Sequence, residues 1–407
     1  MAKHLPASGW TPIVVTVDEA FHEERLDRDL AALVPSSVEV VKAAALSSKY
    51  CRPLGLGEIG LRAWRPLRAA VMKLLATRSV DAVLITGSPY YPMLFAAEIK
   101  RRFGVPVVLD FQDPWVSAWG AEQTLWSKAG ISHRLSVALE PRAVRAADFI
   151  TSVSETQNEQ MAARYPWLDP SRLSPIPIGG DPDDYEMLRQ HSANDRFGLF
   201  DPSVVTLSYV GTFMPRTEPL MRAFLSAFAE ARGRSPNAMA NVRLLFIGTS
   251  NQPNNTDHFR VQPIAQALGI GGVVREIPQR LPYMEAIGAL TRSDGILLIG
   301  SDEVHYTASK IYPGLMSGRP YLSLFHKRSS SHEILSAAGG GISLAFETSD
   351  DLSAMGDAIG SAIVRLVTDP GSLGRAVPTT YAPYTARAIS AQFAAIFERI
   401  AAERKRA

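Results

Sequence analysis

The stretch DAVLITGSPYYPMLFAAEIKRRFGVPVVLDF, residues 81–111, decides the fold class. It begins with a short apolar run at 81–86, continues with a longer segment of helical periodicity, and ends with a second apolar run at 105–111. Short strands that alternate with helices are typical of a parallel sheet with helices on its faces. Residues 81–111 therefore predict one strand–helix–strand unit.

The same alternation recurs along the chain. The other predicted strands are IVVTV (13–17), VEVV (38–41), DFITSVS (148–154), VVTLSYVG (204–211), VRLLFIG (242–248), GVVREI (272–277), DGILLIG (294–300) and PYLSLF (320–325). The pattern stops over an acidic stretch near 178–200 and then restarts. We therefore predict an α/β protein with an N-terminal Rossmann-like domain at 1–185, a C-terminal one at 186–380, and a terminal amphipathic helix at 381–407.

The composition excludes several classes of protein. With 407 residues, 46% hydrophobic and 20% charged, the chain has the composition of a globular protein with two cores. A formal charge of +2 gives no global field for nucleic acid, so no nucleic-acid partner is expected. The single cysteine, Cys51, fits a reducing compartment, and no apolar run is long enough to span a bilayer. We expect a cytoplasmic protein.

Peripheral contact with the inner face of a membrane has one candidate in the sequence, at residues 61–78. This segment, LRAWRPLRAAVMKLLATR, places basic residues beside Trp64 and several apolar residues at near-helical spacing. The alternative, which we favour, is a surface helix whose apolar stripe packs on the sheet.

Four predicted strands end in glycine, at Gly87, Gly211, Gly248 and Gly300. Ligands of open parallel sheets bind beyond the carboxyl ends of the strands, where glycine lets the backbone approach a phosphate. A tight turn explains each glycine equally well when it is taken alone. None of the four belongs to a GxGxxG or GxxxxGK[ST] motif, which disfavours a dinucleotide dehydrogenase and a P-loop kinase.

Five blocks, in this order, resemble the family-four retaining glycosyltransferases of the GT-B fold. They are LITGSPYYPMLFAAEIKRRFGVPVVLDFQDPWVSAW, ADFITSVSETQNEQMAARYP, SRLSPIPIGGDPDDYE, LSYVGTFMPRTEPLMRAF and ASKIYPGLMSGRPYLSLFH, and they cover about residues 80–345. The resemblance implies two Rossmann-like domains that face each other across a cleft, with the terminal helix returning to the N-terminal domain. It also implies sugar transfer with retention from a nucleotide-sugar donor to a glycan or lipid-linked acceptor, in polysaccharide or glycolipid biosynthesis.

The resemblance assigns the donor side to the C-terminal domain. Gly211 and Arg216 match the phosphate-loop glycine and a basic residue on the donor diphosphate, and Lys310 matches the basic residue before the donor-binding helix. Two fixed cations and a helix N-terminus would stabilise a departing diphosphate, so no metal and no cofactor is expected. Ordinary surface cations are the alternative. Ser330 and Ser331 are further candidates, as hydroxyl donors near the donor.

Asp113 in FQDPW is the acceptor-side and catalytic candidate, because its carboxylate follows a buried strand and could orient an acceptor hydroxyl. Trp115 would wall the cleft, and Gly87 and Ser88 would line it with backbone N–H groups. In the competing interpretation Asp113 is a helix-cap or turn residue and Trp115 belongs to the core.

The sequence departs from the family pattern in two places. Two glutamates of the family correspond to His305 and Pro313, and proline supplies neither a carboxylate nor an N–H, so we expect a helix to begin close to Pro313. The usual opening strand of the N-terminal domain is also missing, since the sequence before residue 13 resembles a helix end. We expect a gap between the strands at 13–17 and 81–86, and either a start assigned too far downstream or a degenerate domain explains it.

Two other functions fit this fold. A nucleotide-sugar epimerase would need convergent carboxylates and a histidine around the sugar, which the sequence does not provide. A GT-B binding protein without turnover is suggested by the missing glutamate and the missing strand. The sugar, the nucleotide, the acceptor and the oligomeric state do not follow from the sequence.

Overall fold

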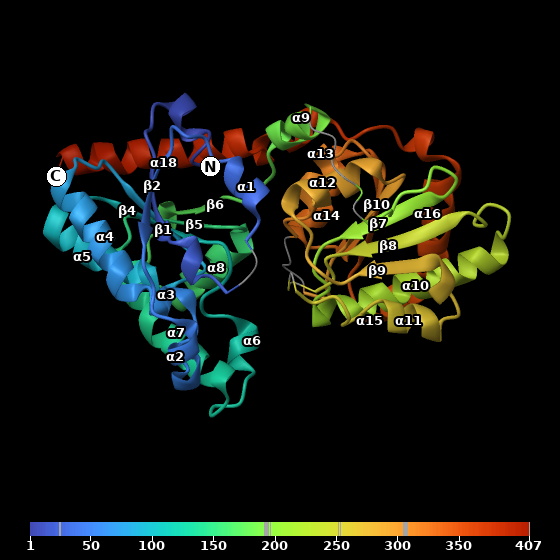
Figure 1. Ribbon diagram of the computed structural model, residues 1–407, viewed down its shortest axis with the longest axis horizontal. Helices are drawn as coiled ribbons and strands as arrows, with labels where there is room; N and C mark the ends of the chain where they lie inside the picture. Colours follow the sequence, from blue (N-terminus) through green and yellow to red (C-terminus); the bar gives the residue numbers. More distant parts are fainter. Residues whose placement is uncertain are drawn as a thin grey trace. The chain divides into compact units, whose positions relative to one another are not determined.

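The computed structural model describes residues 1–23, 26–190, 195, 197–250, 252, 254–303 and 308–406. The chain forms two compact units, each with its own sheet and core (Figure 1). Unit 1 comprises Met1–Leu26, Val34–Ile178 and Arg387–Ala407, and unit 2 comprises Asp27–Leu33 and Gly179–Ala386. Among the described residues, no helix is long and apolar enough to cross a membrane.

Unit 1 contains two separate parallel sheets. The larger has the order β3-β4-β5-β6 and the smaller has the order β1-β2. The strands are β1 (Ile13–Val17), β2 (Glu39–Ala43), β3 (Val83–Gly87), β4 (Val107–Phe111), β5 (Phe149–Ser152) and β6 (Leu173–Pro175). Residues 1–12 contain only the 3-10 turn Leu5–Ser8, and β1 does not pair with β3. The expected absence of a strand before Thr11 is confirmed.

The helices of unit 1 cover the sheet on both faces. They are α2 (Ser48–Cys51), α3 (Ile59–Arg62), α4 (Trp64–Thr77), α5 (Phe95–Phe103), α6 (Ala118–Ala121), α7 (Lys128–Ala146), α8 (Glu155–Arg164) and α18 (Ala386–Arg406). The fully buried strand β4 has Val107 and Leu109 in the core with α4, α5 and α7, whereas Val108 belongs to the core beneath α18. This alternation follows from the two-residue period of a strand.

The segment 61–78 forms α4 and the end of α3, and its apolar face is part of the core of unit 1. Leu67, Met72 and Leu75 are buried there. The charges of α4 lie on the opposite side, where Arg68 pairs with Glu98 and Arg78 lies 2.8 Å from Glu39. The structure therefore favours the sheet-packing interpretation of this segment over the membrane interpretation.

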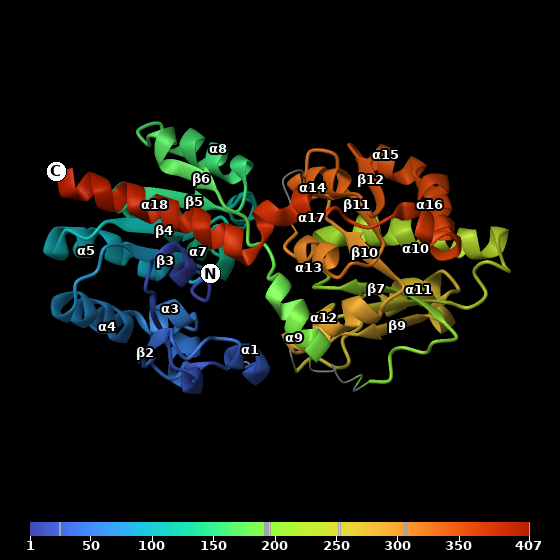
Figure 2. The same cartoon turned by 90° about the horizontal axis from the view of Figure 1, so that it is seen from above.

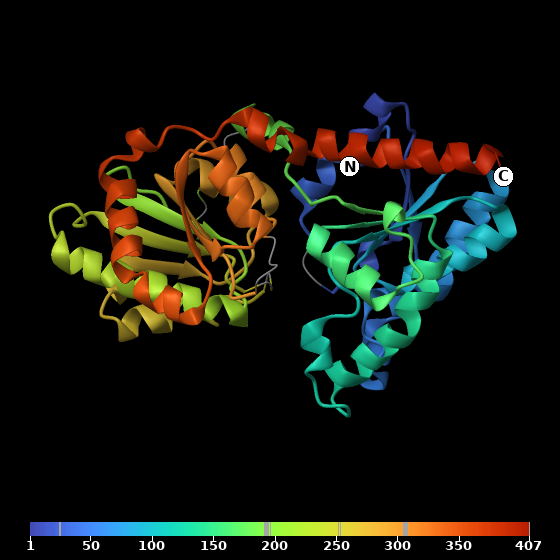
Figure 3. The ribbon, with the colours of Figure 1, turned by 180° about the vertical axis from the view of Figure 1, so that it is seen from behind.

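The terminal helix α18 runs along unit 1 (Figure 3). Ile389, Phe393 and Phe397 are buried against Phe149 in one cluster. Phe397 also meets Trp10 with ring centroids 5.2 Å apart. The helical spacing of these apolar residues explains why one face of the segment packs while its basic end stays in water.

Unit 2 has a six-stranded parallel sheet of order β12-β11-β10-β7-β8-β9. The strands are β7 (Val205–Val210), β8 (Val242–Ile247), β9 (Val274–Ile277), β10 (Gly295–Ile299), β11 (Tyr321–His326) and β12 (Gly341–Phe346). Renumbered from its first strand, this order is the 3-2-1-4-5-6 arrangement of doubly wound nucleotide-binding sheets. The prediction of two Rossmann-like α/β units is confirmed.

Helices cover both faces of this sheet (Figure 2). The helices of unit 2 are α1 (Arg28–Ala32), α9 (Pro182–Gln190), α10 (Glu218–Arg234), α11 (Gln262–Ala267), α12 (Tyr283–Arg292), α13 (Ile311–Met316), α14 (Ser330–Ala338), α15 (Ser349–Ala354), α16 (Gly356–Thr368) and α17 (Pro378–Tyr381). On one face α10 and α16 pack on Tyr209 and Ile299, and on the other α13 and α14 pack on Leu298 and Phe325. Burial on both faces explains why the central strand β10 is apolar throughout.

Candidate functional site

The order in which the chain adds strands to the unit 2 sheet reverses between β7 and β10. From β7 the chain proceeds to β8 and β9 on one side, and then returns to β10, β11 and β12 on the other. In open α/β sheets, ligands bind beyond the carboxyl ends of the strands at such a switch point, because the connections leave in opposite directions and open a crevice. The candidate ligand site therefore lies among the residues that follow Val210 and Ile299.

Lys310 reaches this switch point from the residue before α13. Its Nζ donates to the hydroxyl of Tyr209, in β7, at 2.9 Å and to the carbonyl of Ile299, at the end of β10, at 2.5 Å. The same nitrogen lies 4.2 Å from the centroid of the Tyr209 ring, which is a cation–π contact. Among the described residues, no carboxylate forms an ion pair with Lys310, so its neighbours hold the ammonium without neutralising it.

Burial lowers the pKa of Lys310 to about 7. The low-dielectric surroundings disfavour the charged ammonium, and the neighbouring oxygens are neutral groups. An anion placed beside Nζ would oppose this shift and raise the pKa again. Lys310 is thus suited to meet a negative charge that arrives with a ligand.

Gly211 lies next to the Lys310 side chain, directly after β7. Its φ of +154° is in a region that favours glycine, and a Cβ at this position would lie 3.3 Å from Cδ of Lys310. Its N–H donates to the carbonyl of Ile247 at 2.9 Å, which continues the sheet by one residue. Gly211 therefore turns the chain away from the sheet and leaves room for the lysine stem.

Arg216 connects the same two strand ends on the surface. It lies in the 3-10 turn Pro215–Thr217 after β7, and its Nε donates to Asp302 at 2.7 Å while Nη1 donates to Glu303 at 3.3 Å. The backbone N–H of Asp302 also donates to the carbonyl of Arg216 at 3.1 Å. Arg216 and Lys310 therefore both contact the segment at the end of β10, but Arg216 is half exposed and already paired with carboxylates.

Ser330 and Ser331 begin α14, with Ser329 as the N-cap. Ser331 is fully buried, and its hydroxyl oxygen accepts a hydrogen bond from the backbone N–H of Ala308 at 2.9 Å. This contact ties α14 to the segment that leads into Lys310. Ser330 is half-buried. The geometry gives Ser331 an internal role in positioning the chain near the lysine.

Pro313 lies in the first turn of α13, which begins at Ile311, as expected from the missing N–H of proline. Its carbonyl accepts a hydrogen bond from the Tyr185 hydroxyl at 2.5 Å. His305, the other position at which the family has a glutamate, lies outside the described residues. Asp302 and Glu303 are the described carboxylates of this loop, and both are engaged by Arg216.

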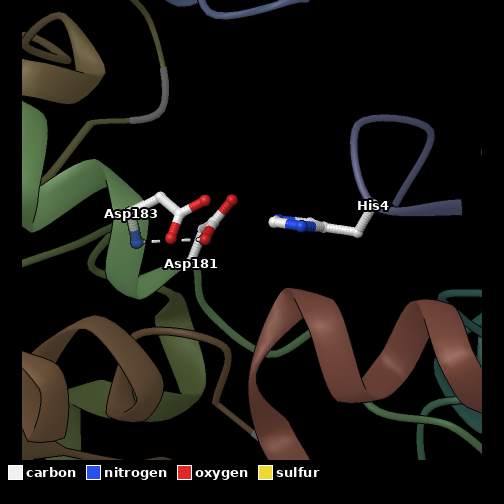
Figure 4. Close-up of side chains that lie close together, drawn as sticks. All are labelled: His4, Asp181 and Asp183. Carbon is white, nitrogen blue, oxygen red and sulfur yellow. Dashed lines mark hydrogen bonds between the residues drawn. The ribbon is translucent and has the colours of Figure 1, made fainter. Parts of the chain in front are cut away.

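Two acidic residues at the start of unit 2 make hydrogen bonds within that unit. Asp181 accepts a hydrogen bond from the backbone N–H of Asp183 at 3.1 Å, at the beginning of α9 (Figure 4). Asp184 is buried and accepts a hydrogen bond from the Tyr283 hydroxyl at 2.8 Å. A carboxylate at a helix N-terminus satisfies free backbone donors, which explains this part of the acidic stretch.

Asp113 follows β4 in unit 1 and is exposed. Its backbone carbonyl accepts a hydrogen bond from the Tyr90 hydroxyl at 2.8 Å, which fixes the turn. Among the described residues, the carboxylate has no hydrogen-bond or ion-pair partner, and nearby protein atoms partly desolvate it and raise its pKa. Asp113 does not cap a helix, because Ser117 is the N-cap of α6.

Trp115 differs from its predicted role as a wall of a ligand site. It is only 7% exposed and belongs to the core, where its ring stacks on Tyr90 at 5.4 Å between centroids. Gly87 is buried, and a Cβ there would lie 2.5 Å from the Tyr90 ring, so this glycine makes room for Tyr90. Ser88 is exposed. The packing of the Tyr90 and Trp115 rings explains why a glycine is present at position 87 and a tryptophan at position 115, without a role for a ligand.

Sequence reasoning overlooked Tyr209 and Asp302. Tyr209 lies two residues before Gly211, on the same side of the strand, and that spacing was the available signal. The sequence also contains GxGxxG spacing in GLGEIG at 55–60, but this segment follows a 3-10 turn rather than a strand, and its Glu58 caps α3. It lacks the structural context of a dinucleotide-binding motif.

Comparison with known proteins agrees with this architecture. Residues 1–179 match the family model described as the glycosyl transferase 4-like domain. A structure of HepE from Anabaena in complex with UDP and glucose matches with a TM-score of 0.55 at 13% identity, covering 95% of this chain and 100% of that one.

Two trehalose-phosphate synthases match with similar coverage. The UDP-forming enzyme from Burkholderia vietnamiensis gives a TM-score of 0.60 at 12% identity, and the enzyme from Burkholderia multivorans gives 0.60 at 14%, each covering 96% of this chain and 99% of the other. A search of curated proteins finds no match.

These matches show that the chain has the GT-B fold, and the family model matches its N-terminal part. The resemblance to family-four glycosyltransferases is confirmed over residues 1–179, which match the model of the glycosyl transferase 4-like domain.

Proposed function

We propose that this protein transfers a sugar from a nucleotide-sugar donor, with retention of anomeric configuration, to a glycan or lipid-linked acceptor. The observation that supports this most strongly is the position of Lys310, which joins the ends of β7 and β10 at the switch point of the unit 2 sheet. The described residues offer Lys310 no carboxylate partner, so an anion that binds beside it would favour its charged form.

The donor diphosphate supplies that anion. Lys310 would contact the phosphate oxygens, and Gly211, which places no side chain beside the lysine stem, leaves them room to approach. When the glycosidic bond to the diphosphate breaks, negative charge grows on the leaving oxygen, and a fixed ammonium stabilises it. Arg216 adds a second cation once a phosphate displaces Asp302 or Glu303.

The structures of similar fold suggest which nucleotide to test first. HepE is described in complexes with UDP and with UDP-glucose, and the trehalose-phosphate synthases from Burkholderia vietnamiensis and Burkholderia xenovorans are described as UDP-forming. We therefore propose a uridine diphosphate sugar as the first candidate donor. The identity of the sugar is left to the experiment below.

On the acceptor side we propose Asp113, whose carboxylate has no partner among the described residues and which follows a fully buried strand. A carboxylate of this kind can accept a hydrogen bond from an acceptor hydroxyl and fix its direction. In the retaining reaction the acceptor oxygen forms the new bond to the anomeric carbon as the diphosphate leaves, and the departing phosphate takes the acceptor proton.

The test is to incubate the protein with a panel of UDP-, GDP-, ADP- and dTDP-sugars and to quantify nucleoside diphosphate release and the recovered sugar. Release of one nucleoside diphosphate that depends on an added acceptor, and that is lost in Lys310→Ala, is the expected result. Recovery of an epimerised nucleotide sugar would replace the proposal with an epimerase. Tight binding of a nucleoside diphosphate with no turnover on any acceptor would show a binding protein.

The anomeric outcome needs its own measurement. Proton NMR of the product should show the same anomeric configuration as in the donor sugar. An inverted product would contradict retention while leaving sugar transfer intact.

A further inference from the structure

The segment 116–137 of unit 1 forms a hairpin that exposes large apolar side chains. It comprises α6, the connecting loop and the first half of α7 (Figure 1). Its exposed apolar residues are Trp119 (57% exposed), Leu125 (62%), Trp126 (84%), Ile131 (44%), Leu135 (47%) and Val137 (50%). Six such residues within one short segment are unusual for a soluble surface, where exposed apolar groups are mostly scattered singly.

The hairpin is well packed internally, so these side chains are not exposed by a loose loop. Ser127 caps α7 by accepting a hydrogen bond from the N–H of Gly130 at 3.0 Å, and it donates to the carbonyl of Thr124 at 2.8 Å. A Cβ at Gly130 would lie 2.1 Å from that same carbonyl oxygen, so the loop fits closely against the helix.

Two further contacts fix the hairpin. Gly120 of α6 lies against His133 of α7. At the base, the buried carboxylate of Glu140 accepts a hydrogen bond from the N–H of Val116 at 3.0 Å. The chain thus holds the tryptophans outward on a defined scaffold.

The charges beside these apolar groups are mainly positive. Between residues 116 and 139 the basic residues are Lys128 and Arg134, and the acidic residue is Glu122. The Arg134 guanidinium lies 5.4 Å from the Trp126 ring centroid and donates to the carbonyl of Leu125 at 2.8 Å. A cation held beside an exposed indole suits a boundary where an apolar layer meets anionic groups.

We propose that the hairpin 116–137 is a docking surface for a lipid bilayer that contains anionic headgroups. Trp119, Leu125 and Trp126 enter the interface between headgroups and acyl chains, where the amphipathic indole ring is favoured. Lys128 and Arg134 remain at the headgroup level. The protein lies on the bilayer through this hairpin, and α4 has no part in the contact because its apolar face is buried in the core.

Vesicle binding tests this without any sugar substrate, so its result is independent of the proposed enzymatic activity. The parent protein should co-sediment with vesicles of phosphatidylcholine and phosphatidylglycerol, and the double variant Trp119→Ser, Trp126→Ser should bind at least about tenfold more weakly. The matched control is Trp167→Ser, which removes a tryptophan of unit 1 that is 44% exposed but lies outside the hairpin. The control should bind as the parent does.

Lys128→Gln tests the contribution of charge. It should weaken binding about fivefold on the anionic vesicles and leave binding to pure phosphatidylcholine unchanged. An equal loss on both lipids would contradict the proposed place of Lys128 at the headgroup level.

A second measurement does not depend on a polar variant folding correctly. Lipids with brominated acyl chains should quench the tryptophan emission of the parent, and the conservative variant Trp119→Phe, Trp126→Phe should lose that quenching. The proposal is wrong if the parent does not bind vesicles, if the control loses binding as strongly as the double variant, or if quenching persists in the phenylalanine variant. It is also wrong if the parent does not bind vesicles and the hairpin variants change its oligomeric state. The hairpin would then bind a second copy of the chain.

Discussion

The ammonium nitrogen of Lys310 lies 2.9 Å from the Tyr209 hydroxyl and 4.2 Å from the centroid of the same ring. The tyrosine therefore holds the cation with its hydroxyl oxygen and its π face, neither of which has a full negative charge. The remaining contact, the carbonyl of Ile299, is also neutral. The site thus holds the Lys310 amine in place without a counter-charge, and an anionic ligand would favour its charged form.

Lys310→Ala should weaken binding of the nucleoside diphosphate about ten- to a hundredfold, because it removes one charge-assisted contact. The melting temperature of the free protein should change little, since the lost hydrogen bonds are offset by removal of a desolvated charge. Isothermal titration calorimetry with UDP measures the first effect and a thermal melt the second. Lys73→Ala, an exposed lysine on α4, is the control of equal charge. Unchanged affinity in the Lys310 variant would remove the donor assignment.

Binding of the diphosphate should take up a proton above neutral pH. The pKa of Lys310 is about 7 in the free protein, so near pH 8 the side chain is mostly neutral, and the ligand raises the pKa by favouring the ammonium. Affinity should therefore fall as the pH rises above 7. Calorimetry at pH 8 in buffers of different ionisation enthalpy should show uptake of close to one proton. Lys310→Arg should abolish that uptake, because arginine stays charged.

The same lowered pKa predicts how Lys310 affects stability. The pKa in the folded state, about 7, is below that of an unfolded lysine, so the unfolded chain binds more protons between pH 7 and about 10. The contribution of Lys310 to the free energy of unfolding therefore rises with pH across that window. Urea titrations of the parent and of Lys310→Met should differ most below pH 7 and converge as the pH approaches 10. Curves that stay parallel would contradict the shift.

Asp302→Asn should tighten diphosphate binding about three- to tenfold. Asp302 holds Arg216 at 2.7 Å and places a negative charge at the end of β10, where the phosphates would arrive. The asparagine removes the repulsion and leaves Arg216 less strongly held. The effect should shrink at high salt, because the pair is partly exposed. Glu230→Gln, which alters an exposed pair with Arg234 on α10, should leave the affinity unchanged.

The fold could be predicted from the sequence because its signals are local. Apolar runs such as VPVVLDF and DGILLIG bury on both faces, so their strand character does not depend on distant partners. The beginning of helix α13 close to Pro313 follows from the chemistry of proline itself. Such features are properties of a few neighbouring residues, and the structure contains them where the pattern indicates.

The contacts of the candidate site could not be predicted in the same way. Tyr209 and Lys310 are 101 residues apart, and they meet only because β7 and β10 are neighbours in the sheet. Strand order is a property of the whole unit. The sequence also left two interpretations of Trp115 open, one as the wall of a ligand site and one as a core residue. Its stacking partner Tyr90 follows a different strand, so the contact between them depends on strand order.

Gly211→Ala should weaken diphosphate binding and lower stability by about 1 kcal/mol or more. At a φ of +154° any side chain is strained, and the new Cβ would lie 3.3 Å from the Lys310 stem. Gly233→Ala is the control, with an expected effect of opposite sign. This glycine is in α10, and a methyl group added there would meet no atom within 4 Å. That change should stabilise the protein by about 0.5–1 kcal/mol. Equal effects of the two substitutions in urea unfolding would contradict the conformational argument.

Glu140→Ala should be the most destabilising of these changes, at about 3–5 kcal/mol. The Glu140 carboxylate is fully buried in unit 1 and accepts hydrogen bonds from the Tyr165 hydroxyl at 2.8 Å, from Arg164 at 3.0 Å and from the N–H of Val116 at 3.0 Å. Its removal leaves three donors unsatisfied and frees the base of the hairpin 116–137. Urea unfolding measures the loss.

Glu159→Ala, on the exposed side of α8, should by comparison cost no more than about 0.5 kcal/mol. Limited proteolysis of the Glu140 variant should also cut within 116–137 before the rest of unit 1, because the hairpin loses the contact that fixes its first residue. If the Glu140 variant unfolds with the parent's midpoint, the carboxylate does not anchor the hairpin. Uniform cleavage across unit 1 would show that it supports the whole core rather than the hairpin base.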